Sequence, residues 1–283
     1  MSRWPNSSSA AYSGRRVALG TKHGKDRALR PALFALCGLE VAGTSALDTD
    51  ALGTFTGEVP RFGSMLDAAR EKARRAMAEL GLPLGIGSEG SFGPHPLVPW
   101  LPSGTETLVF IDEERGLEIV ESAISEHTNF AALTLTPETD LPEFLTRIGF
   151  PAHAVVVSAP GFIEKGIMSA EVLDRALRDA LPLGPVRVET DMRAHLNPTR
   201  MAEIARLAHR LATRLSTPCP ACGQPGFGET GVERGLPCAD CGTPTSAVRA
   251  HIHSCPACGY SEARLPPGGP PEADPGHCPA CNP

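Results

Sequence analysis

Lysine, aromatic residues and long apolar runs are scarce in this chain. Only 4 of its 26 basic residues are lysines, and aromatic side chains make up 5% of its 283 residues. No stretch approaches the roughly 18 apolar residues of a membrane span, and the serine-rich start, Met1 to Gly14, lacks the apolar core of a secretory signal. These absences exclude a membrane-embedded protein and predict a cytoplasmic one, with residues 1–14 as a disordered leader.

An excess of positive charge is also missing, as are common catalytic signatures. The formal net charge is −6, whereas a protein that coats nucleic acid needs clustered lysine and arginine to displace counterions from phosphates. No G-x-x-x-x-G-K-[ST], G-x-S-x-G or H-E-x-x-H motif is present. The sequence therefore argues against a nucleic-acid coat, a P-loop nucleotidase, an elbow-type serine hydrolase and a zincin.

Cysteine is the residue that stands out instead. Eight of the nine cysteines lie after residue 217 as four Cys-x-x-Cys knuckles. The pairs are Cys219 and Cys222, Cys238 and Cys241, Cys255 and Cys258, and Cys278 and Cys281. In a chain without a secretory signal this spacing indicates metal ligation rather than disulfides, because two thiolates separated by two residues grip one tetrahedral ion. Four knuckles predict two four-cysteine sites.

The segment around the knuckles needs a metal in order to fold. Residues 217–283 are rich in glycine and proline and have few large apolar side chains, so they bury too little surface to fold unaided. We expect a small C-terminal double zinc-ribbon domain with two structural zinc ions. Iron is the alternative, since Cys255-Pro-Ala-Cys258-Gly-Tyr and Cys278-Pro-Ala-Cys281 resemble rubredoxin knuckles.

The sequence leaves the pairing of the knuckles open. Intervals of 15, 13 and 19 residues separate successive knuckles, and each accommodates a short hairpin. Sequential, nested and interleaved pairings all fit these intervals, and we favour the sequential one. Because the thiolate count is complete, we expect His251, His253 and His277 at the surface or beside the ligands.

The cysteine-rich segment is also acidic. It carries three arginines against six carboxylates, and a site with four thiolates and one zinc ion adds two more negative charges. Contact with nucleic acid is therefore disfavoured, and a structural or protein-docking role is preferred. This gives the alternative for the whole chain, a noncatalytic adaptor that docks a protein partner through its ribbons.

Residues 15–216 alternate strand-like and helix-like segments, which predicts an α/β domain with a mixed sheet flanked by helices. We expect strands near residues 16–20, 84–88, 107–112, 117–122, 154–158 and 186–189. We expect helices near residues 28–37, 64–80, 141–148, 170–180 and 198–215. Reactive groups of such a domain gather where strands end, and polar stretches lie at several of these ends.

The first polar stretch follows the first strand. Lys22, His23, Gly24 and Lys25 lie in a turn before a helix. Free backbone N–H groups, the positive helix terminus and two lysines favour a phosphate or carboxylate there, so these residues are candidate substrate contacts. A solvated basic turn is the other interpretation.

The second stretch, Ser88 to Pro96, is expected to form a glycine-containing loop directly after a strand. Its small residues let the backbone approach a ligand. Ser88, Ser91 and His95 are candidate substrate contacts, and Glu89 is a candidate catalytic or metal-binding carboxylate. A loop that only turns a corner fits the same residues.

The third stretch, Glu189 to Met201, leaves a strand and enters a helix. Arg193 and Arg200 are candidate phosphate contacts, and Asp191 and His195 are candidate catalytic groups. A capped helix start with an internal salt bridge is the alternative.

Several segments carry a family resemblance. They are Lys22-His-Gly-Lys25, Asp48-Thr-Asp50, Gly53-Thr-Phe-Thr56, Ser88 to Pro96, Glu189-Thr-Asp-Met-Arg193, Asn197-Pro-Thr-Arg-Met201, Ala273-Asp-Pro-Gly276 and Cys278-x-x-Cys281-Asn-Pro283. In these segments the chain resembles a bacterial family known as an uncharacterised domain of unknown function. The resemblance covers nearly the whole chain from Val17 and implies an architecture without an activity.

The N-terminal part also looks like the inosine triphosphate pyrophosphatases. The matching motifs are Ala18 to Lys25, Thr54-Phe55, Ala68 to Ala73 on a helix and Gly87 to Ser91. This resemblance implies that Lys25 and Lys72 contact phosphate and that Glu89 holds magnesium. The chain departs from the family pattern at Lys22 and Ala68, where the family has asparagine, and at Glu89, where it has paired aspartates.

These observations predict an enzyme whose α/β domain binds a phosphorylated small molecule or a nucleotide. The basic residues that would neutralise phosphate are Lys22, Lys25, Arg193 and Arg200. Glu89 and Asp191 would hold Mg²⁺ or orient water, and His23, His95 or His195 would transfer protons. The hypothesis is a Mg-dependent phosphohydrolase or pyrophosphatase, with no nucleic acid or membrane as partner.

Overall fold

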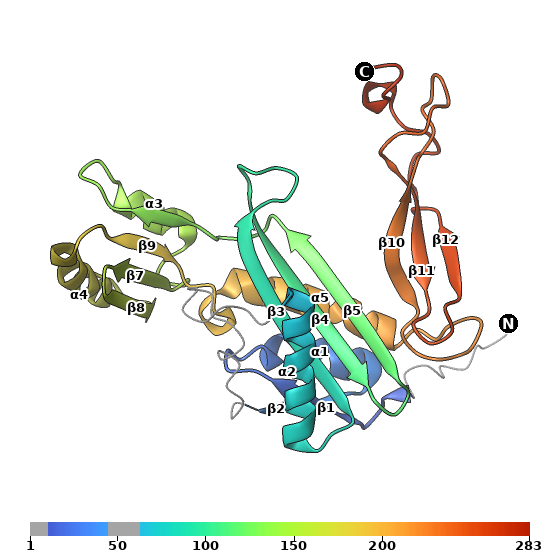
Figure 1. Ribbon diagram of the computed structural model, residues 1–283, viewed down its shortest axis with the longest axis horizontal. Helices are drawn as coiled ribbons and strands as arrows, with labels where there is room; N and C mark the ends of the chain where they lie inside the picture. Colours follow the sequence, from blue (N-terminus) through green and yellow to red (C-terminus); the bar gives the residue numbers. More distant parts are fainter. Residues whose placement is uncertain (1–10, 45–62) are drawn as a thin grey trace. The chain divides into compact units, whose positions relative to one another are not determined.

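The computed structural model describes residues 11–44 and 63–283, which divide into two units (Figure 1). Residues 12–212 form an α/β unit, and residues 213–283 form a cysteine-rich unit. Residues 1–10 of the predicted leader, the Asp48-Thr-Asp50 motif and the segment from Gly53 to Thr56 lie outside the described residues.

The disordered leader predicted for residues 1–14 extends too far, because its last residues are folded. Tyr12 is only 1% exposed, and its hydroxyl donates a hydrogen bond to Asp112 Oδ2 at 3.1 Å. Its ring packs edge-on against Phe110 with the centroids 5.3 Å apart. Residues 12–14 therefore belong to the folded α/β unit, because a buried aromatic ring anchors them.

The core of the α/β unit is a five-stranded sheet with the order β2-β1-β3-β4-β5. Its strands are β1 (Arg16–Gly20), β2 (Glu40–Thr44), β3 (Leu84–Pro94), β4 (Pro102–Asp112) and β5 (Leu117–Ser125). The first three run parallel, and β4 and β5 are antiparallel to their neighbours. From β1 the chain crosses through α1 (Asp26–Cys37) to β2 on one side, then through α2 (Met65–Leu80) to β3 on the other. The carboxyl ends of β1 and β3 therefore flank a topological switch point.

Strand β3 is longer than predicted. The expected loop after Ser88 is wrong, since residues 88–94 continue the strand and pair with β4 along its whole length. Only residues 95–101 turn. The glycines look like loop residues in the sequence, but they allow close packing: a Cβ on Gly87 would lie 1.7 Å from the carbonyl oxygen of Ala69 in α2. Strand β2 was not predicted.

Helices cover both faces of this sheet. Helix α2 begins with a capping box, in which Ser64 Oγ accepts a hydrogen bond from the Asp67 N–H and the Asp67 carboxylate accepts one from the Ser64 N–H. Its alanine-rich side packs on one face. On the other face lies α5 (Pro198–Leu215), whose Arg210 pairs with Glu121 of β5 at 2.8 Å. The thiol of Cys37 in α1 contacts the carbonyl of Ala212 in α5, so α1 lies beside α5.

A second sheet completes the α/β unit. It has the order β6-β9-β7-β8 and consists of β6 (Ala132–Thr134), β7 (Val155–Ala159), β8 (Phe162–Ile167) and β9 (Arg187–Thr190). Helices α3 (Leu141–Ile148) and α4 (Ala170–Ala180) supply Phe144 and Leu173 to a core shared with Val155 and Val188. Residues 191–197 lead from β9 into α5. The ranges of α3, α4 and α5 match the prediction, whereas β6 and β8 were not predicted.

The cysteine-rich unit is built on one antiparallel sheet with the order β10-β11-β12. Its strands are β10 (Gly228–Arg234), β11 (Val248–Ser254) and β12 (Ser261–Arg264). The four knuckles lie in the segments before, between and after these strands. Over residues 11–44 and 63–283, no helix combines the length and the apolar character needed to cross a bilayer.

Candidate functional site

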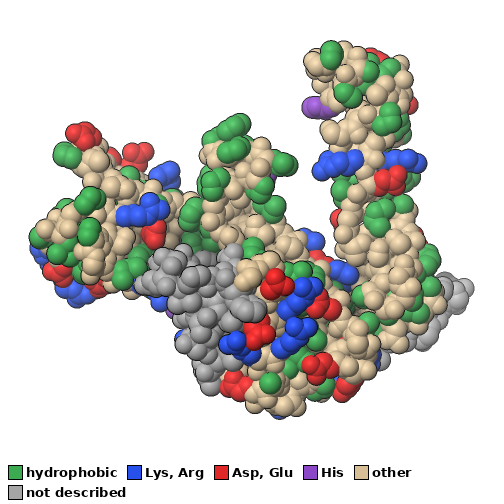
Figure 2. All heavy atoms as spheres, viewed as in Figure 1, with side chains coloured by type: hydrophobic (Ala, Val, Ile, Leu, Met, Phe, Trp, Pro, Cys, Tyr) green, Lys and Arg blue, Asp and Glu red, His purple; other side chains and the backbone are tan. Residues whose placement is uncertain are grey.

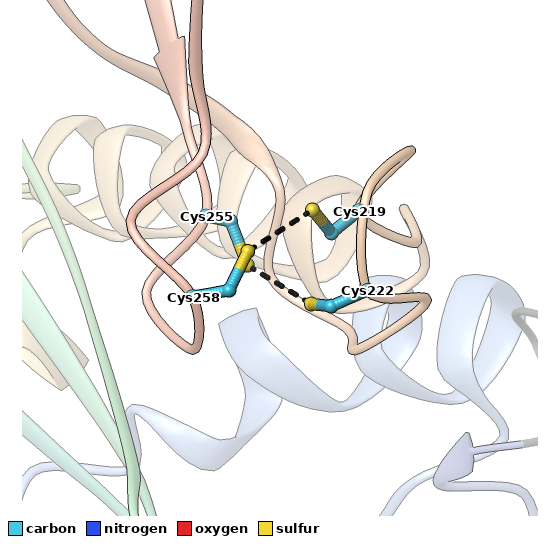
Figure 3. A group of neighbouring side chains, drawn as sticks. All are labelled: Cys219, Cys222, Cys255 and Cys258. Carbon is cyan, nitrogen blue, oxygen red and sulfur yellow. Dashed lines mark hydrogen bonds between the residues drawn. The ribbon is translucent and has the colours of Figure 1, made fainter.

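The eight cysteines of the cysteine-rich unit gather in two groups. Cys219, Cys222, Cys255 and Cys258 form the first, and Cys238, Cys241, Cys278 and Cys281 form the second. Within each group all four Sγ atoms lie within 4.8 Å of one another. In the first group the Sγ distances are 3.8 Å from Cys219 to Cys258 and 3.7 Å from Cys222 to Cys255 (Figure 3). The second group has matching distances of 3.9 and 3.6 Å.

These distances fit metal ligation. A tetrahedral ion with sulfur ligands at about 2.3 Å places neighbouring sulfur atoms about 3.8 Å apart. A disulfide would instead bring two sulfur atoms to about 2.05 Å. Backbone N–H groups of Ala221, Ala257 and Ala280 point at the sulfur of the first cysteine in their knuckles, each at 3.4 Å, which favours the thiolate form. Each group is a four-thiolate cage suited to one metal ion, and histidine is absent from both.

The favoured sequential pairing is wrong, because the first knuckle joins the third and the second joins the fourth. The three strands explain this. Each interval between knuckles contains one strand rather than a hairpin, and a strand of seven residues spans about 24 Å. The chain therefore runs from the first group to the second along β10, returns along β11, and leaves again along β12. Consecutive knuckles lie at opposite ends of the sheet and cannot share an ion.

In the α/β unit, the turn after β1 brings Lys25 to the switch point. Thr21 Oγ1 accepts hydrogen bonds from the N–H groups of His23 and Lys25, which shapes the turn. Lys25 stands at the N-terminus of α1 and is 8% exposed. Its Nζ lies 3.0 Å from Ser88 Oγ and 3.4 Å from the Ser88 carbonyl oxygen. The first and second polar stretches therefore meet.

Lys25 is a buried lysine that has no carboxylate partner among the described residues. Among the described residues, no Asp or Glu oxygen lies within ion-pair distance of its Nζ. Burial, together with the nearby Arg200 guanidinium, lowers the pKa of this amine from 10.5 to about 7. Buried charges in proteins are normally paired, so an amine in this setting favours either its neutral form or a bound anion.

Arg200 brings the third stretch to the same region. It is 2% exposed, and its Nε lies 2.5 Å from Glu106 Oε1 on β4. Its guanidinium also contacts the Met192 carbonyl and covers the ring of Phe92 at 5.0 Å. Gly90 makes room for this pair, since a Cβ there would lie 2.4 Å from the Arg200 guanidinium.

A cavity of about 20 Å³, room for about one water molecule, opens beside this pair. Phe92 and Leu207 give it apolar walls, while Glu106, Arg200 and His127 line it with polar groups. It lies along the same face of β3 as Ser88, because Ser88, Gly90 and Phe92 alternate onto one face.

Glu89 points to the opposite face of the sheet. Its carboxylate lies 2.5 Å from Lys72 Nζ of α2, and both side chains are buried. Ser91 lies on this face as well, by the alternation of the strand. Glu89 therefore does not share a site with Ser88 and Arg200, although it contributes to the electrostatic environment of Lys25.

Asp191 is held by its own loop. Its carboxylate accepts hydrogen bonds from the backbone N–H groups of Gly166 and Arg193, both at 3.0 Å. The Arg193 guanidinium lies 2.6 Å from the same carboxylate. These contacts match the internal salt bridge that was the alternative interpretation of this stretch.

His195 meets the first stretch. Its ring stacks on that of His23 with the centroids 5.2 Å apart and the planes at 11°. Partial burial lowers the pKa of His195, and the nearby Arg193 charge lowers it further. Lys22 is exposed in the same turn. His95 lies elsewhere, in the turn at the end of β3, where its Nδ1 accepts hydrogen bonds from the N–H groups of Leu97 and Val98.

Sequence reasoning missed Glu106 and the cavity residues. Glu106 lies within a strand that was predicted to begin only at residue 107. A strand pattern extended by a few residues would place it opposite Gly90, which is its partner in the sheet. His127 and Leu207 carry no motif and reach the cavity only through tertiary packing.

Comparisons with known proteins gave one match. A family model described as "Domain of unknown function (DUF6671)" matches residues 72–283. Searches of the curated proteins and of the solved structures found no match, so the likeness to inosine triphosphate pyrophosphatases stays a resemblance of N-terminal motifs. The predicted membership in a family of unknown function is confirmed, and because the model covers more than half of the sequence, the chain belongs to the DUF6671 family.

Proposed function

We propose that each four-cysteine group holds one zinc ion in a structural role. Four thiolates with tetrahedral spacing leave no open position for a substrate, which is typical of structural rather than catalytic zinc. The metal would supply the stability that a small sheet with exposed strands lacks, since most side chains of β10 are exposed.

Elemental analysis of the purified full chain tests the zinc assignment. Two zinc ions per chain are expected. Iron in their place would colour the protein and overturn the choice of metal without changing the ligand set.

We propose that the α/β unit binds a small molecule with a phosphate group at the switch point between β1 and β3. The observation that carries the proposal is Lys25, a buried lysine whose Nζ contacts only Ser88 among the described residues. A bound anion would provide its missing counter-charge. Ligands of open α/β sheets bind outside the carboxyl ends of strands at such a point.

The neighbouring charges support an anion rather than a cation. The charges that act on Lys25 are those of Lys72, Arg200, Glu89 and Glu106, and the two carboxylates already pair with Lys72 and Arg200. The positive end of α1 adds further positive charge. On the face drawn in Figure 2, the described basic and acidic side chains are interspersed, so this face has no uniformly positive surface.

The organic part of the ligand would extend from Lys25 along β3 toward Phe92. Gly90 lies two residues beyond Ser88 on the same face of β3, about 7 Å along the strand, and its neighbours Glu106 and Arg200 line the cavity. A phosphate at Lys25 with a ring or acyl chain along this stretch of β3 is the arrangement we propose for a nucleotide or a phosphorylated metabolite.

As an enzyme, the α/β unit would hydrolyse the phosphate ester or anhydride of that ligand. Glu89 and Asp191 lie in separate ion pairs, and the described residues contain no cluster of three Asp, Glu or His side chains with metal-ligand spacing. We therefore name no residues that would bind Mg²⁺. Its effect is tested by adding it together with the ligand.

Thermal shift and isothermal titration with pyrophosphate, ATP and sulfate, each with and without Mg²⁺, test the binding. Wild type is expected to bind at least one of these anions, and Lys25→Met is expected to lose that binding. Lys165→Met, on β8, is the matched control and is expected to bind as wild type does. Equal affinity of wild type and Lys25→Met would overturn the proposal. Release of phosphate is measured in the same samples.

A further inference from the structure

We propose that Ser88 and Lys25 form a nucleophile and base pair, in which Ser88 Oγ attacks the phosphoryl group of the bound ligand. This inference rests on the proposed function, because it needs the phosphate to lie beside Lys25. It adds a covalent step that anion binding alone does not require. The site is assigned from residues that the motifs placed in two separate stretches.

The geometry of the pair suits proton transfer. Ser88 Oγ and Lys25 Nζ are 3.0 Å apart, within reach of a direct hydrogen bond. Both residues are more than nine-tenths buried. Ser88 lies on a strand that is hydrogen-bonded to β1 and to β4, so the backbone holds its hydroxyl in place.

The electrostatic setting favours the basic form of Lys25. A lysine acts as a general base only when its amine is neutral, and burial next to another cation favours that form. Lys25 has both features, since it is buried and the Arg200 guanidinium is close enough to lower its pKa. A surface lysine next to a serine would stay protonated at neutral pH and could not take the proton.

The reaction balances with water as its only co-reactant. Ser88 Oγ bonds to phosphorus while the bond from phosphorus to the leaving oxygen breaks, and Lys25 Nζ takes the hydroxyl proton and passes it to that oxygen. Water then attacks phosphorus, Lys25 takes a proton from the water, and the bond between phosphorus and Oγ breaks. Ser88 Oγ recovers its proton from Lys25. The net change is hydrolysis of one phosphoryl bond.

Covalent labelling tests the pair independently of any substrate. Diisopropyl fluorophosphate has a P–F bond that a nucleophilic serine breaks, leaving a phosphoryl ester and fluoride. Intact-protein and peptide mass spectrometry of the full chain are expected to find one adduct on Ser88. The labelling rate should rise with pH around neutrality, as the amine loses its proton. Label on another serine, or no label, would overturn the inference.

Variants separate the roles of the two residues. Lys25→Arg keeps the charge but cannot act as a base, so labelling should fall at least about 100-fold while sulfate binding persists. Lys25→Met, which needs less space, should lose both. Ser91→Ala, on the opposite face of β3, should label like wild type. Unchanged labelling of both Lys25 variants would refute the role of Lys25 as the base.

The failure of this inference is distinguishable from that of the proposed function. If Ser88→Ala still binds sulfate or pyrophosphate like wild type and wild type does not label, the anion site stands and the covalent step is wrong. If no anion binds to wild type, the proposed function itself fails. The two activities should also have opposite pH dependence, because sulfate needs the protonated amine and labelling needs the neutral one.

Discussion

Replacement of Lys25 by methionine is expected to stabilise the α/β unit. The pKa of the Lys25 amine falls from 10.5 to about 7 on folding because the side chain is buried. Below pH 10.5 the unfolded chain therefore holds a proton that the folded chain binds more weakly, and this difference favours unfolding. Methionine has a similar length and carries no proton, so Lys25→Met removes the penalty.

The size of the effect follows from the proton-binding difference. With a pKa of about 7 in the folded chain and 10.5 in the unfolded chain, the penalty is about 4 kcal/mol at pH 7 and about 2 kcal/mol at pH 9. These are upper values, because the variant also leaves Ser88 without its Lys25 contact. Wild-type stability should accordingly rise with pH between 7 and 10.5, where the unfolded state binds more protons, and the advantage of the variant should shrink.

Urea denaturation followed by circular dichroism at 222 nm measures this difference. The signal reports the α/β unit, because the α-helices of the described residues end at Leu215. Arg74→Met, at an exposed position of α2, is the control and should change stability by less than about 0.5 kcal/mol at either pH. The reasoning is refuted if Lys25→Met is no more stable than wild type at pH 7. It is equally refuted if the difference between them is the same at pH 9.

Three further changes test other parts of the structure. Cys222→Ser combined with Cys258→Ser should leave one zinc ion per chain, whereas Cys222→Ser combined with Cys241→Ser should leave none, as measured by elemental analysis after gel filtration. Gly87→Ala should lower the free energy of unfolding by about 3 kcal/mol in urea titrations, because the new methyl group meets the backbone of α2 and not a movable side chain. Arg200→Met should lower it by about 3–5 kcal/mol, because the buried Glu106 carboxylate loses its partner.

Each of these predictions has its own control and its own refutation. Equal zinc content in the two double cysteine variants would contradict the interleaved pairing. Gly93→Ala is the control for Gly87→Ala, since nothing lies within 4 Å of a Cβ at that position. An equal loss of unfolding free energy in both variants would disprove the packing argument. Joint replacement, Arg200→Met with Glu106→Gln, should recover part of the loss from the single change. No recovery would mean that the two side chains do not act as a pair.

The sequence predicts the helices of the α/β unit better than its strands. The helices at residues 141–148, 170–180 and 198–215 match because polar caps and a 3.6-residue period mark them. Strand β3 was cut short because Gly-Ser-Glu-Gly-Ser has the composition of a loop. Gly85, Gly87 and Gly90 even have the G-x-G-x-x-G spacing of a dinucleotide-binding turn, yet they lie inside a strand. Their lack of a side chain serves contact with α2 and with Arg200.

The candidate site was predictable in part. Lys25 and Ser88 meet because Lys25 follows β1 and Ser88 lies in β3 just beyond the residues that pair with β1, at the switch point that the α/β pattern implies. The separation of Glu89 from Ser88 was not predicted, because a residue assigned to a loop has no fixed face. Once β3 is known to continue, the two-residue period alone places these neighbours on opposite sides. The prediction of sequential knuckle pairing was wrong for a similar reason. A hairpin between two knuckles returns the chain to the same end of the sheet, whereas a single strand carries it to the opposite end.

The alternation of the knuckles along three strands couples the two cages thermodynamically. An ion in the first cage fixes the register of β10 against β11 and thereby brings the second and fourth knuckles closer to their final positions. The second ion then orders less chain than the first, so we expect the two ions to bind cooperatively. By linkage, each ion should raise the affinity for the other by the same factor. Titrated with zinc and viewed by native mass spectrometry, the protein should pass from the empty to the doubly loaded form with little of the singly loaded species.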